Sequence, residues 1–396
     1  MPSLDPAIWR DRPGMDRLLL ALEASSGKTR IVGGAVRDAL LEQPVSDIDF
    51  ATTLLPGEVL ERLEAAGIRA VPTGLRHGTV TAIVGGQPHE ITTLRRDVET
   101  DGRHARVAFT DDWQADASRR DFTINALYAD PLTGAIFDYV TGLADLSTRT
   151  VRFIGDPLLR IAEDHLRILR FFRFSARFSD VLEPSGLAAC AARARDLMAL
   201  SRERIRDELL KLLVAPRAVP TLAAMCAHGI LAPVLPEADD VAALAALAEV
   251  EQRAGVAPDP LRRLASLLPA DAQLAAQVAS RLRLSNSQKM RLVAAAERTP
   301  VPDDPRALAY AIGPEATLDR LLLTGDLRAA AWAGQLRTWK RPRLPVSGKD
   351  LIQMGVPPGP EVSRLLREVE GRWVAAGFPP DRSCALALAR QAVGLR

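Results

Sequence analysis

The stretch Ile31–Thr52, IVGGAVRDALLEQPVSDIDFAT, constrains this chain more than any other. A short β-branched run ends at Gly33 and Gly34, a helix is predicted from about Ala35, and a second strand follows. Glycines lack a Cβ atom and let backbone N–H groups approach an anion, and the N-terminus of a helix adds partial positive charge. The stretch therefore predicts a phosphate site, although a Gly-Gly pair alone is more often an ordinary turn.

Two aspartates on the second predicted strand add metal chemistry to this stretch. Asp47 and Asp49 are two residues apart, so a strand places them on one face, with Ile48 and Phe50 on the other. Two adjacent carboxylates repel each other unless they share a cation, and such oxygen ligands suit Mg²⁺ bridged to substrate phosphates. A lone pair of this kind also occurs on exposed strands. The combination with the glycine turn and the helix is much more specific.

The residues GGAVRDALLEQPVSDIDFAT resemble the signature of the class II tRNA nucleotidyltransferase and bacterial poly(A) polymerase family, within the polymerase-beta-like nucleotidyltransferase superfamily. This resemblance implies that Asp47 and Asp49 hold two catalytic Mg²⁺ ions. It also implies that Gly33, Gly34 and Arg37 cradle the triphosphate of a nucleotide. Two metal ions in such a site clamp the attacking and leaving oxygens of an in-line displacement.

The chain departs from the family pattern at two positions. Glu42 stands where the family usually has glycine after the Leu-Leu pair, and glycine there would end the helix with a positive φ. We therefore expect a different turn at Glu42. Thr141 and Gly142 stand where the family usually has two glycines, in the predicted hinge, so we expect a hinge of different flexibility.

A third carboxylate is expected from a neighbouring strand. The stretch HEITTLR resembles the family strand that supplies it, and this makes Glu90 the candidate; an exposed strand glutamate is the alternative. The following stretch, Arg95–Trp113, is polar and charged, and we expect a mobile loop. It resembles the flexible loop of complete CCA-adding enzymes, which favours an enzyme that also adds the terminal A.

The block RRDFTINAL at Arg119–Leu127 matches the family almost letter for letter. Arginine side chains fork onto phosphate oxygens, and an aspartate accepts hydrogen bonds from sugar hydroxyls. The resemblance implies that Arg120 and Asp121 hold the ribose and the triphosphate. The alternative is an ion pair at the start of a helix, with Asp121 as its cap.

A single amphipathic helix is predicted over Pro157–Phe178, with proline in its first turn. Asp164 and Arg167 lie three residues apart on its polar face, with Arg170 at the edge. The pattern EDHLR resembles the family's protein template, in which such a pair hydrogen-bonds the Watson–Crick edges of cytosine and adenine. A carboxylate accepts from their exocyclic amines, whereas uracil and guanine present a carbonyl there. The alternative is an intrahelical ion pair on a solvated face.

The chain as a whole is expected to have an α+β fold. We predict a small mixed α/β nucleotidyltransferase head (residues 1–135), a hinge and nucleotide-selecting neck (136–195), a helical body (196–330) and a helical tail (331–396). Further helices are predicted over Pro6–Ala24, Pro56–Ala66 and Ser201–Leu213, and strands near Ile68–Val71, Gly78–Val84 and His89–Leu94.

The predicted tail carries basic residues near Trp332 and Trp339 and resembles the part of the family that grips tRNA. Basic side chains bind the RNA backbone, and aromatic rings stack on bases. The alternative is a surface helix that happens to be basic. The basic residues are Arg337, Lys340, Arg341, Arg343 and Lys349.

Composition limits the class of protein and its compartment. A chain of 396 residues with 47% hydrophobic residues and a net charge of +2 describes a globular protein, so any nucleic-acid surface needs local clustering. Its cysteines, Cys190, Cys226 and Cys384, lack metal-ligand spacing and are expected to be buried free thiols in a reducing compartment. We find no secretory signal and no apolar run of membrane-spanning length, so we expect a cytoplasmic protein without a membrane partner.

These features together predict template-independent addition of CCA to the 3′ end of tRNA, using CTP and ATP and releasing pyrophosphate. Asp47, Asp49 and Glu90 are the predicted catalytic residues, and no protein partner is evident. The nearest alternative is a poly(A) polymerase of the same family. An inactive RNA-binding protein on the same fold and a nucleotide-sugar enzyme are alternatives of other classes.

Overall fold

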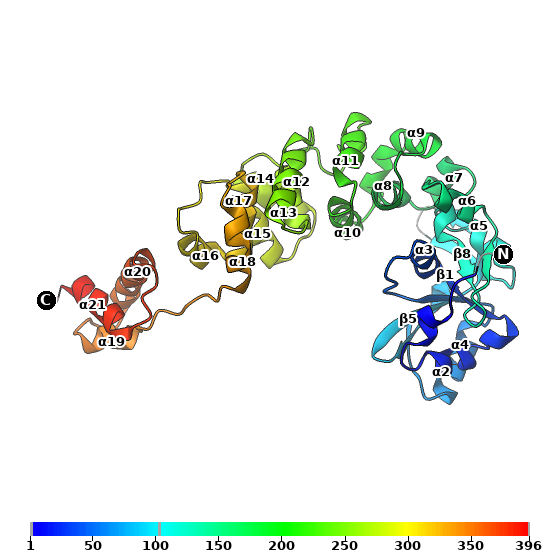
Figure 1. Ribbon diagram of the computed structural model, residues 1–396, viewed down its shortest axis with the longest axis horizontal. Coiled ribbons are helices and arrows are strands. Elements are labelled where there is room, and N and C mark those ends of the chain that lie inside the picture. The colour runs from blue at the N-terminus through cyan, green and yellow to red at the C-terminus, as the bar shows by residue number, and fades with distance from the viewer. Residues whose placement is uncertain (1–2, 102–103, 395–396) are drawn as a thin grey trace. The chain divides into compact units, whose positions relative to one another are not determined.

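The computed structural model describes residues 3–101 and 104–394 and forms two compact units, residues 1–234 and 235–396. All described strands belong to the first unit, where strands and helices alternate, and the second unit is helical (Figure 1). The expected α+β class, a mixed head followed by helices, is confirmed. The finer division into head, neck, body and tail stays a prediction.

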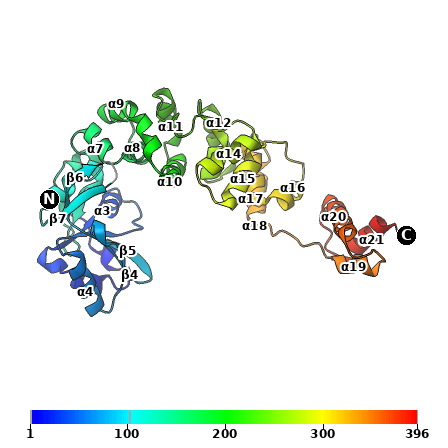
Figure 2. The same cartoon turned by 180° about the vertical axis from the view of Figure 1, so that it is seen from behind.

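A seven-stranded sheet forms the centre of the first unit, with the order β3-β4-β5-β2-β1-β8-β9. The pair β2 and β5 is parallel and the other neighbouring pairs are antiparallel, and β4 and β5 lie side by side in the view from behind (Figure 2). The register pairs Phe50 with Ile91, so the preceding residues, Asp49 and Glu90, are neighbours on adjacent strands. The strands are β1 (Thr29–Val32), β2 (Asp49–Thr52), β3 (Arg69–Gly74), β4 (Thr79–Val84), β5 (Gln87–Thr93), β8 (Leu127–Ala129) and β9 (Ile136–Asp138).

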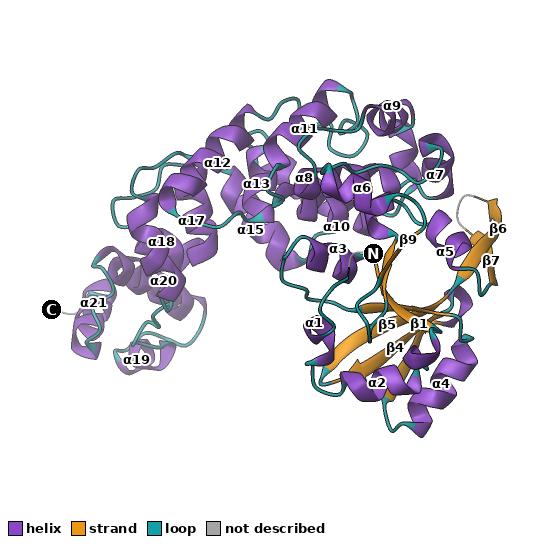
Figure 3. Ribbon diagram, turned by 45° about the vertical axis from the view of Figure 1, so that its right-hand side comes forward, coloured by secondary structure: helices purple, strands orange, loops and turns teal. Residues whose placement is uncertain are grey.

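Helices α3 (Gly34–Leu40) and α4 (Pro56–Ala65) pack on this sheet, the first against β1 and β8 and the second against β3 and β4 (Figure 3). The helix expected over Pro6–Ala24 is wrong, because α1 (Ala7–Arg10) and α2 (Met15–Ala21) are separate. Between them Gly14 has φ +81°, a left-handed conformation that no helix interior adopts.

The turn after α3 corrects the expectation for Glu42. This residue has φ +55°, its N–H donates to the carbonyl of Ala39, and the N–H of Gln43 donates to the carbonyl of Asp38. These two bonds form the Schellman ending that glycine favours at this position. The expected change of turn is therefore absent, because Glu42 adopts the conformation that glycine has in this type of turn. Thr141, at the start of α6 (Gly142–Ser147), likewise has φ +65°.

The segment Arg95–Trp113 contains a hairpin, so the expectation of a loop is wrong. Strands β6 (Arg95–Asp101) and β7 (His104–Phe109) pair antiparallel in a small second sheet (Figure 3), and residues 102–103 lie outside the described residues. The alternation of polar and apolar residues in HARV, residues 104–107, is a strand pattern. The many charges around it conceal that pattern in the sequence.

The helix expected over Pro157–Phe178 is two helices, α7 (Pro157–Glu163) and α8 (Arg167–Phe178). Asp164 between them has an extended backbone, with φ −151° and ψ 105°. The ring of His165 hydrogen-bonds the carbonyl of Ile161 at 2.9 Å, and the Asp164 carboxylate accepts from the N–H of Leu166 at 3.1 Å. Local side-chain bonds of this kind compete with the helical ladder and explain the break.

The rest of the first unit is helical. The expected helix Ser201–Leu213 is confirmed as α10 (Arg202–Leu213), and the Ser201 side chain caps it. The other helices here are α5 (Trp113–Ser118), the 3₁₀ helix η3 (Thr123–Asn125), α9 (Pro184–Ala192) and α11 (Ala218–Ala227).

The second unit contains two apolar clusters. One is built around Leu247, Leu321 and Leu336, and the other around Trp373 and Ala389. Its helices are α12 (Ala242–Ala254), α13 (Pro260–Ser266), α14 (Ala272–Arg281), α15 (Asn286–Ala296), α16 (Arg306–Ile312), α17 (Pro314–Leu323), α18 (Ala329–Thr338), α19 (Gly348–Gln353), α20 (Pro360–Ala375) and α21 (Arg382–Val393).

The cysteines and the helix lengths test two further expectations. The three cysteines are free, as expected, but only Cys190 is fully buried; Cys226 is partly buried and Cys384 is exposed. The expectation that all three are buried is therefore wrong for Cys384, on the exposed first turn of α21. Among the described residues, no helix combines the length and the apolar character needed to cross a membrane.

Candidate active site

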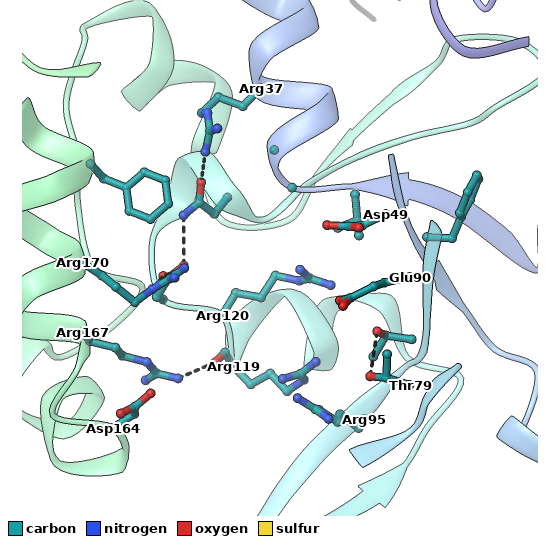
Figure 4. Close-up of a pocket in the computed structure, with 18 of the residues that line it drawn as sticks. Arg37, Asp49, Thr79, Glu90, Arg95, Arg119, Arg120, Asp164, Arg167 and Arg170 are labelled. Carbon is teal, nitrogen blue, oxygen red and sulfur yellow. Dashed lines mark hydrogen bonds and ion pairs between the residues drawn. The ribbon is translucent and has the colours of Figure 1, made fainter. Parts of the chain in front are cut away.

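A cavity of about 530 Å³ lies in the first unit between the sheet and helix α8 (Figure 4). Every predicted site residue except Asp47 lines it, so the structure brings together residues that are far apart in the sequence. The predicted residues in its wall are Gly33, Gly34, Arg37, Asp49, Glu90, Arg120, Asp121, Asp164, Arg167 and Arg170.

Carboxylates stand at the sheet end of the cavity. Asp49 opens β2 and Glu90 lies on β5, and both side chains are exposed, while Ile48 and Phe50 are buried, as the strand alternation requires. Asp47 is exposed in the segment just before β2. Desolvation by the surrounding cavity wall, followed by the charges of Glu90 and Asp47, raises the pKa of Asp49 to about 6. This end of the cavity therefore concentrates negative charge.

These carboxylates fit a hard divalent cation. Their donors are all oxygens, and the repulsion that raises the pKa of Asp49 is the repulsion that a bound cation would relieve. Across the described ranges, no three His, Cys, Asp or Glu side chains are gathered closely enough to hold an ion by themselves. Mg²⁺ is commonly bound by one or two carboxylates together with water and substrate phosphates, so this arrangement suits it.

The glycine turn and Arg37 are tied into the protein. Gly33 has φ +71° and its N–H donates to the carbonyl of Leu127 at 3.0 Å, so this amide is already used. The Arg37 guanidinium is buried, pairs with Asp38 at 2.8 Å and donates to the side chain of Asn125. Burial lowers the pKa of Arg37 in spite of the adjacent Asp38. Its charge faces the cavity from a fixed position.

Asp116 holds both arginines of the RRD block. Its carboxylate is almost fully buried and accepts from Arg119 at 2.8 Å, from Arg120 at 2.9 Å and from the hydroxyl of Tyr128 at 2.8 Å. Burial alone would raise the pKa of Asp116, but the charges of Arg120 and Arg119 outweigh it and hold the pKa at about 2. The arginines are thus presented to the cavity from an ionised anchor.

Asp121 links the RRD block to helix α8. One oxygen accepts from the N–H of Phe122 at 2.9 Å and from the side-chain amide of Asn125 at 3.1 Å, and the other pairs with Arg170 at 2.6 Å. Since Asn125 also accepts from Arg37, a continuous chain of polar contacts runs from α3 to α8 (Figure 4). Burial opposes the charge on Asp121, but Arg170 lowers its pKa below the ordinary value.

Asp164 and Arg167 stand at the helical end of the cavity (Figure 4). Arg167 donates from Nη1 to the carbonyl of Arg160 at 3.0 Å and to Glu163, and from Nη2 to the carbonyl of Arg119 at 3.2 Å. Two of its five N–H donors therefore have no acceptor among the described residues. Asp164 accepts from Leu166 and, at 2.7 Å, from Arg204.

Several residues of the wall were missed from the sequence. Some come from the strands next to the carboxylates or from α8, and the others come from the hairpin and from the RRDFTINAL block. Asp116, which does not line the cavity, was also missed. It carried a usable signal, because it lies three and four residues before Arg119 and Arg120, the spacing of helical ion pairs. The wall residues that were not among the predicted site residues are Val32, Phe50, Thr79, Thr92, Arg95, Arg119, Asn125, Arg173 and Phe174.

Comparison with known families gives two matches along this chain. The profile described as "Poly A polymerase head domain" matches residues 29–152, which contain the carboxylates, the glycine turn and the RRD block. The profile described as "Probable RNA and SrmB- binding site of polymerase A" matches residues 181–241.

Similar proteins cover nearly the whole chain. A "CCA tRNA nucleotidyltransferase 1, mitochondrial" of Danio rerio is 38% identical over 91% of this chain and 86% of its own length. A "CCA-adding enzyme" of Lactobacillus delbrueckii subsp. bulgaricus is 32% identical over 93% of this chain and 95% of its own length. The crystal structure of the Bacillus stearothermophilus CCA-adding enzyme in complex with CTP has a TM-score of 0.66 and 27% identity and covers 96% of this chain and 98% of that one.

Proposed function

This chain belongs to the family of CCA tRNA nucleotidyltransferases, and from this premise we propose how its cavity adds CCA to the 3′ end of tRNA from CTP and ATP. The observation that carries the proposal is the composition of the cavity. It has carboxylates suited to a metal at its sheet end and a carboxylate–arginine pair suited to a base at its helical end. Arginines of the RRD block lie between them (Figure 4).

We propose that Asp47, Asp49 and Glu90 hold two Mg²⁺ ions together with the triphosphate. When bound, the ions supply charge neutralisation for the triphosphate and lower the pKa of the tRNA 3′-hydroxyl. The role of the three carboxylates is to fix the positive charges of these ions beside β2 and β5. The raised pKa of Asp49 and the neighbouring positions of Asp49 and Glu90 support the assignment.

The nucleotide is proposed to lie along the arginine wall. Arg120, held by Asp116, faces the triphosphate, and Asp121 accepts from the ribose hydroxyls while Arg170 keeps it ionised. The triphosphate end of the site is closed by Gly33, Gly34 and Arg37. Because the Gly33 N–H and most of the Arg37 donors are already used, their contribution is shape and positive charge rather than a set of free N–H donors.

Base choice is proposed to depend on Asp164 and Arg167. Asp164 accepts from the exocyclic amine of cytosine or adenine, and the two remaining N–H groups of Arg167 donate to ring acceptors on the same edge. Uracil or guanine would set a carbonyl oxygen against the carboxylate. The two facing acceptors would repel each other and the carbonyl would have no donor, and unpaired polar groups are strongly disfavoured in a cavity.

The chemical step is an in-line displacement. The 3′-hydroxyl oxygen of tRNA forms a bond to the α-phosphorus, the bond to the bridging oxygen breaks, and pyrophosphate leaves with that electron pair. The hydroxyl proton passes to solvent or to a carboxylate at the sheet end. The arginine wall stabilises the charge that develops on the phosphate oxygens.

The exposed basic residues of the second unit are the proposed tRNA-binding surface. The predicted basic residues are all exposed, as this role requires: Arg337, Lys340, Arg341, Arg343 and Lys349. Trp332 and Trp339, in contrast, pack against the apolar cluster around Leu321 and Leu336, which leaves them less surface for stacking on bases. The proposed tRNA contact is therefore mainly to the phosphate backbone. A cytoplasmic location stays a prediction.

The test uses a tRNA transcript that ends at the discriminator base, with Mg²⁺ and with CTP alone, ATP alone or both. CCA synthesis requires two C additions with CTP and one further A when both nucleotides are present. Long A tails with ATP alone would instead identify a poly(A) polymerase, and binding of the transcript without any addition would identify an inactive RNA-binding protein. A chelator provides the control for metal dependence.

A further inference from the structure

Helix α10 carries two charged residues, one helical turn apart, that reach side chains of the cavity wall without lining the cavity themselves. The guanidinium of Arg204 donates from Nη2 to Oδ2 of Asp164 at 2.7 Å. Glu208, four residues later, accepts from Arg173 and lies 3.8 Å from Arg170. One face of α10 therefore supports three residues of the wall, and two of them belong to the proposed nucleotide site.

Asp164 needs such support because of its place in the chain. Its backbone is extended between α7 and α8, so neither helix fixes the direction of its side chain. Its Oδ1 atom accepts from the N–H of Leu166, a bond within its own turn, and its Oδ2 atom accepts from Arg204. Arg204 is thus the one described contact that reaches this carboxylate from another helix.

Glu208 fixes which side of α10 faces the cavity. Its side chain is buried, and its contacts with Arg170 and Arg173 join α10 to α8. Residues four apart share one face of a helix, so the buried Glu208 keeps Arg204 directed towards Asp164. Arg204 itself is about half exposed, and its carboxylate partner is about one-third exposed.

We propose that Arg204 is a positioning residue for base selection. It holds the Asp164 carboxylate so that a free lone pair points at the exocyclic amine of the incoming base, and it makes no contact with the nucleotide. A carboxylate has about four acceptor positions, so the amine adds to the two existing hydrogen bonds without displacing either. The inference rests on the proposed function, because it assigns a second residue to the same selection step.

The size of the effect follows from the exposure of the pair. Removing a partly exposed charge partner weakens but does not abolish an interaction, and about a fivefold loss of selectivity is expected. Loss of Asp164 itself is expected to have the larger effect, because the acceptor is then absent. Arg204→Lys keeps the charge but loses the planar fork and is expected to fall between Arg204→Ala and the native protein.

The experiment is a double-mutant cycle on the native full chain. Arg204→Ala, Asp164→Ala and the double variant are compared in kcat/KM for CTP and for UTP, on a tRNA transcript that awaits its first C. If Arg204 acts through Asp164, Arg204→Ala lowers the CTP-to-UTP ratio in the native background and leaves it unchanged in the Asp164→Ala background. Arg206→Ala provides the control, since Arg206 is on the same helix and pairs with its neighbour Asp207.

Two results would overturn the inference. One is an unchanged CTP-to-UTP ratio in Arg204→Ala, and the other is an equal loss in both backgrounds, which would mean that Arg204 acts elsewhere. The melting temperature of each variant separates a loss of folding from a change in selectivity. If Arg204→Ala does not fold, the CTP-to-UTP ratio is measured on Arg204→Lys instead. The proposed function fails separately, if the native protein adds no C to the transcript.

Discussion

The carboxylate of Asp116 holds the guanidinium of Arg120 at 2.9 Å, beneath the wall of the cavity where the nucleotide is proposed to bind. The same carboxylate holds Arg119 at 2.8 Å and accepts from the hydroxyl of Tyr128, so one buried charge orients two cations. The N–H of Arg95, at the base of the hairpin, also donates to it at 3.3 Å. Asp116 therefore connects the arginines of the RRD block to the hairpin.

Replacing Asp116 with asparagine is expected to lower the free energy of unfolding at neutral pH by about 2 to 3 kcal/mol. The pKa of this group is held near 2 in the folded protein, against about 4 in an unfolded chain. Its stabilisation is therefore present above about pH 4 and is lost as the pH falls towards 2. Urea unfolding of both proteins over this range measures the difference, which should narrow on acidification.

The control for this prediction is Asp180→Asn. Asp180 also pairs with arginine, Arg149 at 3.2 Å, but both side chains are 60% exposed. Exposed pairs contribute little, so this variant is expected to unfold like the native protein. A deficit of Asp116→Asn that stayed constant down to about pH 2 would show that its charge is not the cause.

Replacing Asp49 with asparagine is expected to abolish nucleotide transfer while leaving the fold intact. The side chain is exposed and its charge is disfavoured by Glu90 and Asp47, so its loss relieves repulsion rather than breaking a stabilising contact. The loss of kcat is expected to exceed about a hundredfold. Primer extension on a tRNA transcript measures the activity, and circular dichroism checks the fold. Asp47→Ala is expected to behave in the same way, and near-normal turnover would remove that residue from the site.

Replacing Asp164 with alanine is expected to relax the choice of nucleotide. Without the acceptor, the amine of cytosine gains no partner and the carbonyl of uracil meets no opposing oxygen, so the kcat/KM for UTP approaches that for CTP. Single-nucleotide addition with each of the four triphosphates measures this. Unchanged selectivity would reduce Asp164 to the partner of Arg204 in an ion pair on the protein surface.

Replacing Glu42 with glycine is expected to raise the free energy of unfolding by about 1 kcal/mol. Glu42 has φ +55° in the Schellman turn after α3, a conformation that is strained for a residue with a Cβ atom. Glu61→Gly is the matched control: Glu61 is exposed inside α4, where glycine costs about 1 kcal/mol. Urea unfolding measures the free energy of unfolding of both variants. An increase for Glu42→Gly with a decrease for Glu61→Gly confirms the prediction, and an equal decrease for both contradicts it.

Shortening the hairpin of β6 and β7 is expected to stop A addition while leaving C addition in place. The hairpin begins at Arg95, which lines the cavity and is joined to Asp116, so shortening the hairpin loosens the strand that holds Arg95 beside the proposed nucleotide site. The variant should keep Arg95 and Phe109, which pair at the base of the hairpin. Product length on a denaturing gel distinguishes CC from CCA, and full CCA synthesis would show that the hairpin has no part in the switch.

Much of the sheet was predictable because its strands are short β-branched runs bounded by glycine and proline. The hairpin was not, because its charged residues resemble a loop and the pairing of Arg95 with Phe109 depends on a partner strand. The helix break at Asp164 was hidden for a different reason. Hydrophobic periodicity continues through it, whereas the side-chain bonds of Asp164 and His165 that interrupt the ladder leave no trace in that period.

Within the site, the residues that form compact motifs were found and the residues that support them were not. Asp49, Arg120 and Asp164 belong to segments whose spacing has a chemical meaning. Arg204 lies forty residues from Asp164 and reaches it only because α10 packs on α8. No local pattern in the sequence marks such a pair, since both residues look like ordinary charges on the surface of a helix.

The extended backbone at Asp164 also bears on how this protein tolerates changes in length. In an unbroken helix, one inserted residue turns everything after it by about 100°. Here the helical hydrogen bonds stop before α8. The orientation of α8 is set by its own buried aromatic rings, including Phe171 and Phe172. Insertions and deletions in α7 therefore need not turn Arg167 out of the cavity. Helices α7 and α8, on either side of Asp164, are therefore free to diverge in length independently.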